Sequence, residues 1–85
     1  MDHAANHVRM IEYLRAEILR DPDAEIEPNT PLVSSGLVDS FSLIQVVQEL
    51  EKITSRRIPA SKVAPRDLDT VSQMFATAER VGTPR

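Results

Sequence analysis

The fold is decided by residues 36–55, which read GLVDSFSLIQVVQELEKITS. In this stretch a glycine-led loop gives way to a run whose apolar residues recur every three or four positions, the period of one helix face. The apolar face of the run consists of Leu43, Val46, Val47, Leu50 and Ile53. Asp39 stands just before the run, where its carboxylate can cap the exposed amides of a first helical turn. We therefore predict a helix over residues 40–55.

Ser40 is the first residue of this predicted helix. Backbone N–H groups in the first turn of a helix lack intrahelical partners, and the helix dipole favours negative charge there. A phosphodiester on the Ser40 hydroxyl would therefore be favoured at this position. The alternative is a serine whose hydroxyl does no more than satisfy one of those N–H groups. The residue pattern around Ser40, taken alone, leaves both interpretations open.

Two more amphipathic helices are predicted on either side of this stretch. The first covers residues 3–20 and is ended by Asp21-Pro22, because the residue before a proline avoids helical geometry. Its apolar positions follow helical spacing: Val8, Ile11, Leu14 and Ile18. The last covers residues 70–81, where Thr70 and Gln73 fit a capping box and Gly82 and Pro84 form a stop. Its apolar face consists of Met74, Phe75, Ala78 and Val81.

The connections between the predicted helices differ in length. The first loop, residues 21–39, contains three prolines and few strand-like signals. Four acids lie in its first part, residues 21–27. Connections of this length are usually functional or held in place, and the apolar residues available to hold this one are Ile26, Leu32, Val33 and Leu37. A short helix is expected over residues 60–64, closed by Pro65. The predicted fold is all-α: one domain over residues 1–85, a small bundle of three main helices and one short helix, with a long first loop.

Composition excludes several classes of protein. The chain of 85 residues has no cysteine, so neither a disulfide framework nor a thiolate metal site is expected. It has no apolar run of membrane-spanning length and no signal peptide, and we expect a cytoplasmic protein. Residues 1–39 hold eight acids against three arginines, and residues 40–85 hold five acids against seven basic residues. Neither half shows the basic stripe of a nucleic-acid-binding protein.

Enzymatic and metal sites find little support in the sequence. His3 and His7 lie four residues apart, but position 4 is Ala, a zincin-like motif needs Glu there, and no third ligand is evident. The acids of residues 21–27 lack the glycine and terminal glutamate of a calcium loop. Three serines, Ser34, Ser35 and Ser42, have no nearby histidine to form a hydrolytic triad. We therefore expect neither a metal site nor an enzyme.

Residues 36–43 resemble the cofactor-attachment motif of acyl and peptidyl carrier proteins, in which the serine of an Asp-Ser pair carries 4′-phosphopantetheine. The resemblance extends to other segments of residues 30–81, namely Thr30-Pro31-Leu32, Leu43–Glu51, Ile58-Pro59 and Val63–Val71. Phe41 and the stretch from Pro65 to Val71 resemble stand-alone carriers with a dedicated adenylating ligase, such as D-alanyl and other aminoacyl carriers.

The resemblance implies a function and a set of site residues. Ser40 would bear the 4′-phosphopantetheine arm, taken from coenzyme A, and Asp39 would support its transfer. The helix that follows would contact partner enzymes through Phe41, Ile44, Gln45 and Gln48. The implied partners are a phosphopantetheinyl transferase, an acyl- or aminoacyl-activating ligase, and downstream acyl-transfer enzymes. The chain would then hold acyl or aminoacyl groups as thioesters on its arm.

The sequence also allows a second hypothesis, in which the chain is a different class of protein. In it the chain is a helical adaptor or dimerisation module without a cofactor, which binds a partner through the helix of residues 40–55. In this reading Ser40 is dispensable and Phe41 and Ile44 carry the function. Periodicity also allows Phe41 and Ile44 to be ordinary core residues, because both lie at the boundary of the apolar face.

Overall fold

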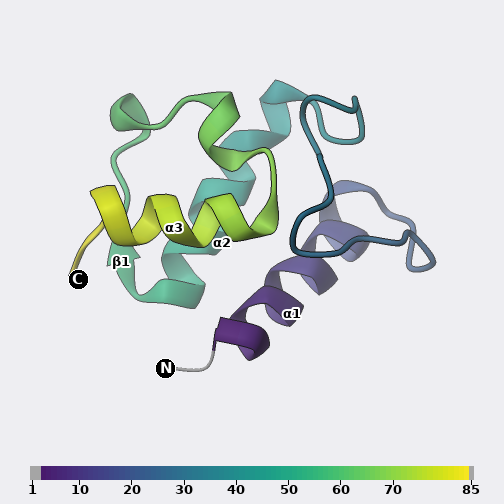
Figure 1. The fold of residues 1–85 in the computed structure, drawn as a ribbon, viewed down its shortest axis with the longest axis horizontal. Coiled ribbons are helices and arrows are strands. Elements are labelled where there is room, and N and C mark those ends of the chain that lie inside the picture. The colour runs from purple at the N-terminus through teal and green to yellow at the C-terminus, as the bar shows by residue number, and fades with distance from the viewer. Residues whose placement is uncertain (1–2, 85) are drawn as a thin grey trace.

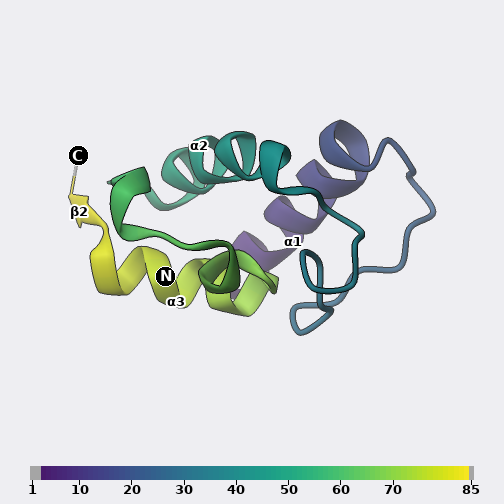
Figure 2. The ribbon, with the colours of Figure 1, turned by 90° about the horizontal axis from the view of Figure 1, so that it is seen from above.

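The computed structural model describes residues 3–84, in which three α-helices are the main elements (Figure 1). They are α1 (His3–Tyr13), α2 (Leu43–Thr54) and α3 (Val71–Val81). Figure 2 shows α2 and α3 lying lengthwise, one above the other, with α1 running obliquely to both. Each helix packs against the other two, because each has one apolar face to bury. The predicted all-α bundle with a long first loop is confirmed.

A single apolar core lies between the three helices. Its largest fully buried side chains come from all three helices, from the first loop and from the segment before α3: Met10, Leu14, Leu32, Val46, Leu50, Leu68, Val71 and Met74. The predicted faces of α2 and α3 are confirmed. The face predicted for α1 is wrong at Val8, which is 52% exposed. The core face of α1 is centred on Met10 and Leu14, and Val8 lies about 200° around the helix from Met10.

The first helix ends earlier than predicted. After Tyr13 the helix widens into a π-helical turn, Leu14–Ile18, and Arg20 then adopts a left-handed conformation with φ of 52°. The N–H of Asp21 donates to the carbonyl of Arg15 at 2.8 Å, which satisfies a carbonyl that the helix leaves open. The left-handed residue therefore stops the helix before Pro22 is reached.

The helix predicted over residues 40–55 is present, but its first turn is tighter than expected. Ser40–Ser42 form a 3₁₀ turn, and α2 proper begins at Leu43. The helix ends where Ser55 turns left-handed, with φ of 55°. Tight 3₁₀ geometry is common at helix termini, and sequence periodicity does not distinguish it from an α-helical turn.

The connection between α2 and α3 holds two short turns where one was predicted. One 3₁₀ turn spans Ala60–Lys62 and a second spans Pro65–Leu68. Pro65 was expected to close the first turn, and it opens the second. Proline suits the first helical position because its fixed φ matches a helix and its missing N–H is not needed there. Leu68, at the end of the second turn, is buried in the core.

A two-residue strand pair joins the end of α2 to the chain beyond α3, although no strand was predicted. Its strands are β1 (Arg56–Arg57) and β2 (Thr83–Pro84), and they pair antiparallel. Two residues are too short to show alternation in the sequence. Gly82 lies at this junction with an extended backbone, and a Cβ atom there would collide with the Ala78 carbonyl and crowd the Arg56 side chain. Glycine is needed for this close approach and not for a left-handed turn.

Within residues 3–84, no helix is both long enough and apolar enough to cross a membrane.

The core makes one prediction about stability. Leu50 has no exposed surface, so Leu50→Ala should lower the free energy of unfolding by about 2–5 kcal/mol, through lost burial and a residual cavity. For a domain whose total stability is about 5–15 kcal/mol, this is a large fraction. Urea denaturation followed by circular dichroism measures it. Ile44→Ala, on the exposed face of the same helix, is the matched control and should change stability by no more than about 0.5 kcal/mol.

Candidate functional site

Ser40 lies on the surface, at the first position of the 3₁₀ turn that opens α2. Asp39 precedes it with an extended backbone, and its Oδ1 accepts from the N–H of Phe41 at 2.8 Å and from that of Ser42 at 3.1 Å. The predicted capping role of Asp39 is therefore confirmed. The same contacts correct the expectation of open amides for a phosphodiester, since the carboxylate already occupies two of them.

An apolar groove begins beside Ser40 and runs between α2 and residues 58–68. Its volume is about 360 Å³. One side is lined by Ser40, Leu43, Ile44, Val47, Gln48 and Glu51, and the other by Ile58, Ala60, Val63, Ala64, Pro65 and Leu68. The sequence analysis missed this groove, because its two sides come from separate segments whose pairing depends on the tertiary fold. The only sequence signal was the apolar character of each segment.

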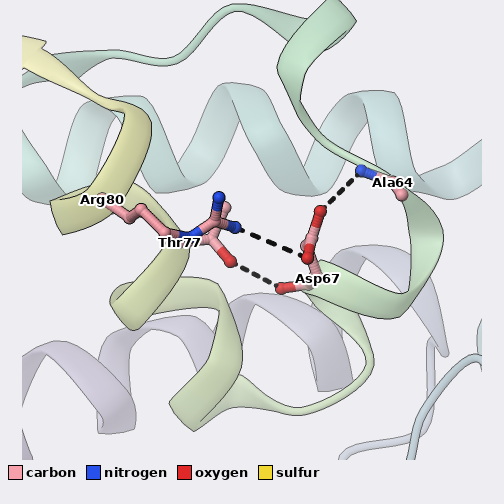
Figure 3. Close-up of polar contacts among 4 residues, drawn as sticks. All are labelled: Ala64, Asp67, Thr77 and Arg80. Carbon is pink, nitrogen blue, oxygen red and sulfur yellow. Dashed lines mark hydrogen bonds and ion pairs between the residues drawn. The ribbon is translucent and has the colours of Figure 1, made fainter.

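The segment that forms the second side of the groove is fixed at both ends. At its start, the N–H of Ile58 donates to Oε2 of Glu51 on α2 at 2.8 Å. At its end, Asp67 makes the contacts drawn in Figure 3. Its carboxylate accepts from the Ala64 N–H at 2.9 Å and lies 3.5 Å from the Arg80 guanidinium, and its carbonyl accepts from the buried Thr77 hydroxyl at 3.0 Å. These contacts fix the second wall of the groove against α2 at one end and against α3 at the other.

An exposed apolar patch lies next to Ser40. Phe41 is 86% exposed and Ile44 is 67% exposed, which excludes the core interpretation for both residues. Leu37, at 48% exposure, belongs to the same neighbourhood of the chain. The prediction that Leu37 holds the first loop to the core is wrong; the neighbouring Val38 is buried instead. Gln45 and Gln48 are exposed beside the patch, and no residue from Ser40 to Gln48 carries a charged side chain.

Asp69 fixes the first loop, which leads to Ser40. Its Oδ1 accepts from three consecutive N–H groups, at 3.2 Å from Leu32, 2.7 Å from Val33 and 2.8 Å from Ser34. Its Oδ2 accepts from the Ser34 hydroxyl at 2.8 Å. The bonds from the Ser34 N–H and hydroxyl, helped by those from Val33 and Leu32, hold the pKa of Asp69 below its usual value, and partial burial opposes them. Asp69, which directly precedes the N-cap residue Thr70, thus holds loop residues 32–34 close to the start of α3.

The remaining candidates of the sequence form no site. His7 lies against Phe75, with ring centroids 5.1 Å apart, while the side chain of His3 lies outside the described part of the structure. In the acidic part of the first loop, Asp21 caps the N–H of Asp23 at 3.0 Å. Throughout the described chain, no three His, Cys, Asp or Glu side chains are grouped so as to hold a metal ion.

Comparison with known proteins gives one match. The family model for the phosphopantetheine attachment site matches residues 10–77, which include Ser40, both sides of the groove and most of the core. No curated protein and no solved structure matches the chain.

The Asp69 contacts make a prediction about pH. Because the pKa of this carboxyl is lowered on folding, its contribution to stability is present above the ordinary value of 3.8 and is lost as the pH falls below it, towards the lowered pKa. Acid titration of unfolding should therefore show a loss of stability in that range, which Asp69→Asn removes. Amide hydrogen exchange at Val33 and Ser34 should be faster in this variant at neutral pH.

The exposed Asp23 provides the control for this prediction. Asp23→Asn should leave both the acid profile and the exchange rates of Val33 and Ser34 unchanged. Equal exchange rates in wild type and Asp69→Asn would contradict the role assigned to the Asp69 carboxylate.

Proposed function

The chain belongs to the phosphopantetheine attachment family, and on this basis we propose that Ser40 is the residue that bears the 4′-phosphopantetheine arm. The family carries this cofactor covalently, so the chain is a carrier with such an arm. The observation that supports Ser40 most directly is its exposed hydroxyl at the start of α2, directly after the capping Asp39 and within the matched residues. Ser42, two residues later, is half-buried.

The residues around Ser40 fit such an arm. When bound, the arm supplies a terminal thiol to a chain that has no cysteine of its own. The groove that starts at Ser40 is mostly apolar and has two polar side chains, the exposed Gln48 and the half-buried Glu51, which suits a flexible chain with amide groups. We propose that Ser40 holds the arm and that Leu43, Val47 and Val63 exclude water from its apolar part.

In the attachment chemistry this chain supplies the hydroxyl that attacks coenzyme A. The Ser40 oxygen forms a bond to the phosphorus that carries pantetheine, the pyrophosphate bond of coenzyme A breaks, and the nucleotide leaves with the other phosphate. A base on the transferase takes the Ser40 proton. Asp39 already holds the first turn through two amides, which keeps the serine in one backbone position while the transferase approaches. We propose that its second oxygen, which has no hydrogen bond or ion pair within residues 3–84, would supply a ligand for the metal ion that accompanies coenzyme A.

We propose that the loaded chain carries acyl or aminoacyl groups as thioesters and is not itself an enzyme. Tethering raises the local concentration of cargo at each docked partner without tight binding. The proposed partners are a phosphopantetheinyl transferase, an acyl- or aminoacyl-activating ligase, and the enzymes that take the cargo onward. The exposed Phe41 and Ile44, with Gln45 and Gln48, are the proposed contacts for these partners.

Incubation with coenzyme A, Mg²⁺ and a broad-specificity phosphopantetheinyl transferase tests the attachment site. Intact mass should rise by one phosphopantetheine in the wild type and remain unchanged in Ser40→Ala, because the variant has no hydroxyl at that position. Ser42→Ala, a neighbouring hydroxyl in the same turn, is the matched control and should be modified fully. Addition of the arm to a folded Ser40→Ala protein would contradict the proposal.

The partner surface is tested by the kinetics of the same reaction. Phe41→Ala should lower kcat/KM of the transferase by about 5- to 30-fold, the usual effect of removing an aromatic residue worth about 1–2 kcal/mol at an interface. Stability should remain unchanged, since the ring is exposed. Val8→Ala removes an exposed apolar side chain from α1 and serves as control. If the Val8 and Phe41 variants react at equal rates, Phe41 is not a contact for this enzyme.

A further inference from the structure

Basic residues are concentrated in one stretch of the chain. Residues 52–66 hold five basic side chains and no acid: Lys52, Arg56, Arg57, Lys62 and Arg66. This stretch covers the end of α2, strand β1 and both 3₁₀ turns that precede α3. The whole chain has a net charge of −3, so the charge of this stretch opposes that of the molecule.

Four of the five basic side chains are exposed, and we call these four, Lys52, Arg57, Lys62 and Arg66, the basic rim. The fifth, Arg56, is half-buried and donates to the Gly82 carbonyl at 3.4 Å. Within residues 3–84, no side chain of the basic rim forms an ion pair or a hydrogen bond. The structure of the isolated chain therefore gives these four charges no partner among the described residues.

The basic rim borders the groove that begins at Ser40. Lys62 and Arg66 lie on the segment that forms one side, each next in sequence to a lining residue, Val63 and Pro65. Lys52 lies on α2 one turn beyond the lining residue Gln48 and so continues that surface of the helix. The rim and the exposed patch of Phe41 and Ile44 thus flank the same groove.

Acidic side chains do not neutralise the rim. Glu51, at the groove, is half-buried and accepts from the Ile58 N–H, while Asp67 is paired with Arg80. Six of the thirteen acids lie within residues 12–27, a stretch that also holds two arginines. Figure 1 shows the first loop at the opposite end of the long axis from β1, and the molecule extends 33 Å along this axis. Charge is thus separated along the length of the protein.

We propose that the basic rim is a docking surface for an acidic surface on the partner enzyme that covers Ser40. This inference rests on the proposed function of Ser40. Twelve residues of helical rise, about 18 Å, separate Ser40 from Lys52. A standard interface buries about 800 Å² on each partner, and a round patch of that area is about 30 Å across, which is wider than this separation. Complementary charge at such a position steers the encounter and fixes the orientation in which the partner meets the serine.

The probe for this proposal is a broad-specificity phosphopantetheinyl transferase in two forms. One is the natural enzyme, and the other carries additional Asp and Glu residues around the face that receives the carrier. At low ionic strength the acidified form should modify the wild-type chain with kcat/KM about tenfold higher than the natural form, and salt should remove the difference. Intact mass over time gives both rates.

Two carrier variants locate the effect. The triple variant Lys52→Glu, Lys62→Glu, Arg66→Glu should lose the preference for the acidified enzyme or reverse it. The control Glu25→Lys, Glu27→Lys changes exposed charges in the first loop and should keep the preference. Circular dichroism verifies that both variants are folded.

Each outcome either supports or overturns the docking role of the basic rim. No preference in the wild type, or the same preference in the triple variant, overturns the role of the rim while leaving arm attachment at Ser40 intact. Rim-dependent binding of a DNA duplex or of phosphatidylserine vesicles, without a preference for the acidified enzyme, would assign the rim to another class of partner. If neither enzyme form modifies Ser40, the proposed function fails and this inference fails with it.

Discussion

The carboxylate of Asp69 controls the placement of the first loop, and the loop controls the placement of Ser40. The Val33 and Ser34 amides and the Ser34 hydroxyl bond to this side chain, and the Leu32 amide bonds both to it at 3.2 Å and to the Asp69 carbonyl at 2.7 Å. They lie 35 to 37 residues away from it in sequence. A loop of this length has a large conformational entropy, and few of its residues reach the core. Charge-assisted bonds to backbone amides hold the loop where apolar contacts alone are few.

The second helix serves the core and the surface at once. Its inner face buries Val46 and Leu50, while Phe41 and Ile44 near its start remain exposed. A large exposed aromatic ring contributes little to the stability of the isolated chain, and such residues are enriched where proteins bind partners. Because the buried face packs the helix into the bundle, substitutions at the exposed Phe41 and Ile44 should leave the fold intact.

Local features of the structure could be predicted from the sequence. The caps at Asp39 and Thr70 are formed by the residues expected, and the apolar faces of α2 and α3 follow their periodicity. These features depend on neighbours within a few residues. Where several apolar residues compete, as Val8 with Met10 or Leu37 with Val38, periodicity does not select the buried one. That selection depends on the packing of distant segments.

The groove is the feature that could not be predicted from the sequence, because it depends on tertiary contacts. Its second wall is positioned by contacts that use main-chain groups: the Ile58 amide on Glu51, the Ala64 amide on Asp67, and the Asp67 carbonyl on Thr77. Carboxylates of this kind look in the sequence like ordinary surface acids. Glu51 bonds to the Ile58 amide, Asp67 bonds to the Ala64 amide and pairs with Arg80, and neither carboxylate pairs with Lys62 or Arg66 on the same wall. The carboxylates that hold the second wall in place are therefore not ones that neutralise the basic side chains at its border, as far as residues 3–84 are concerned.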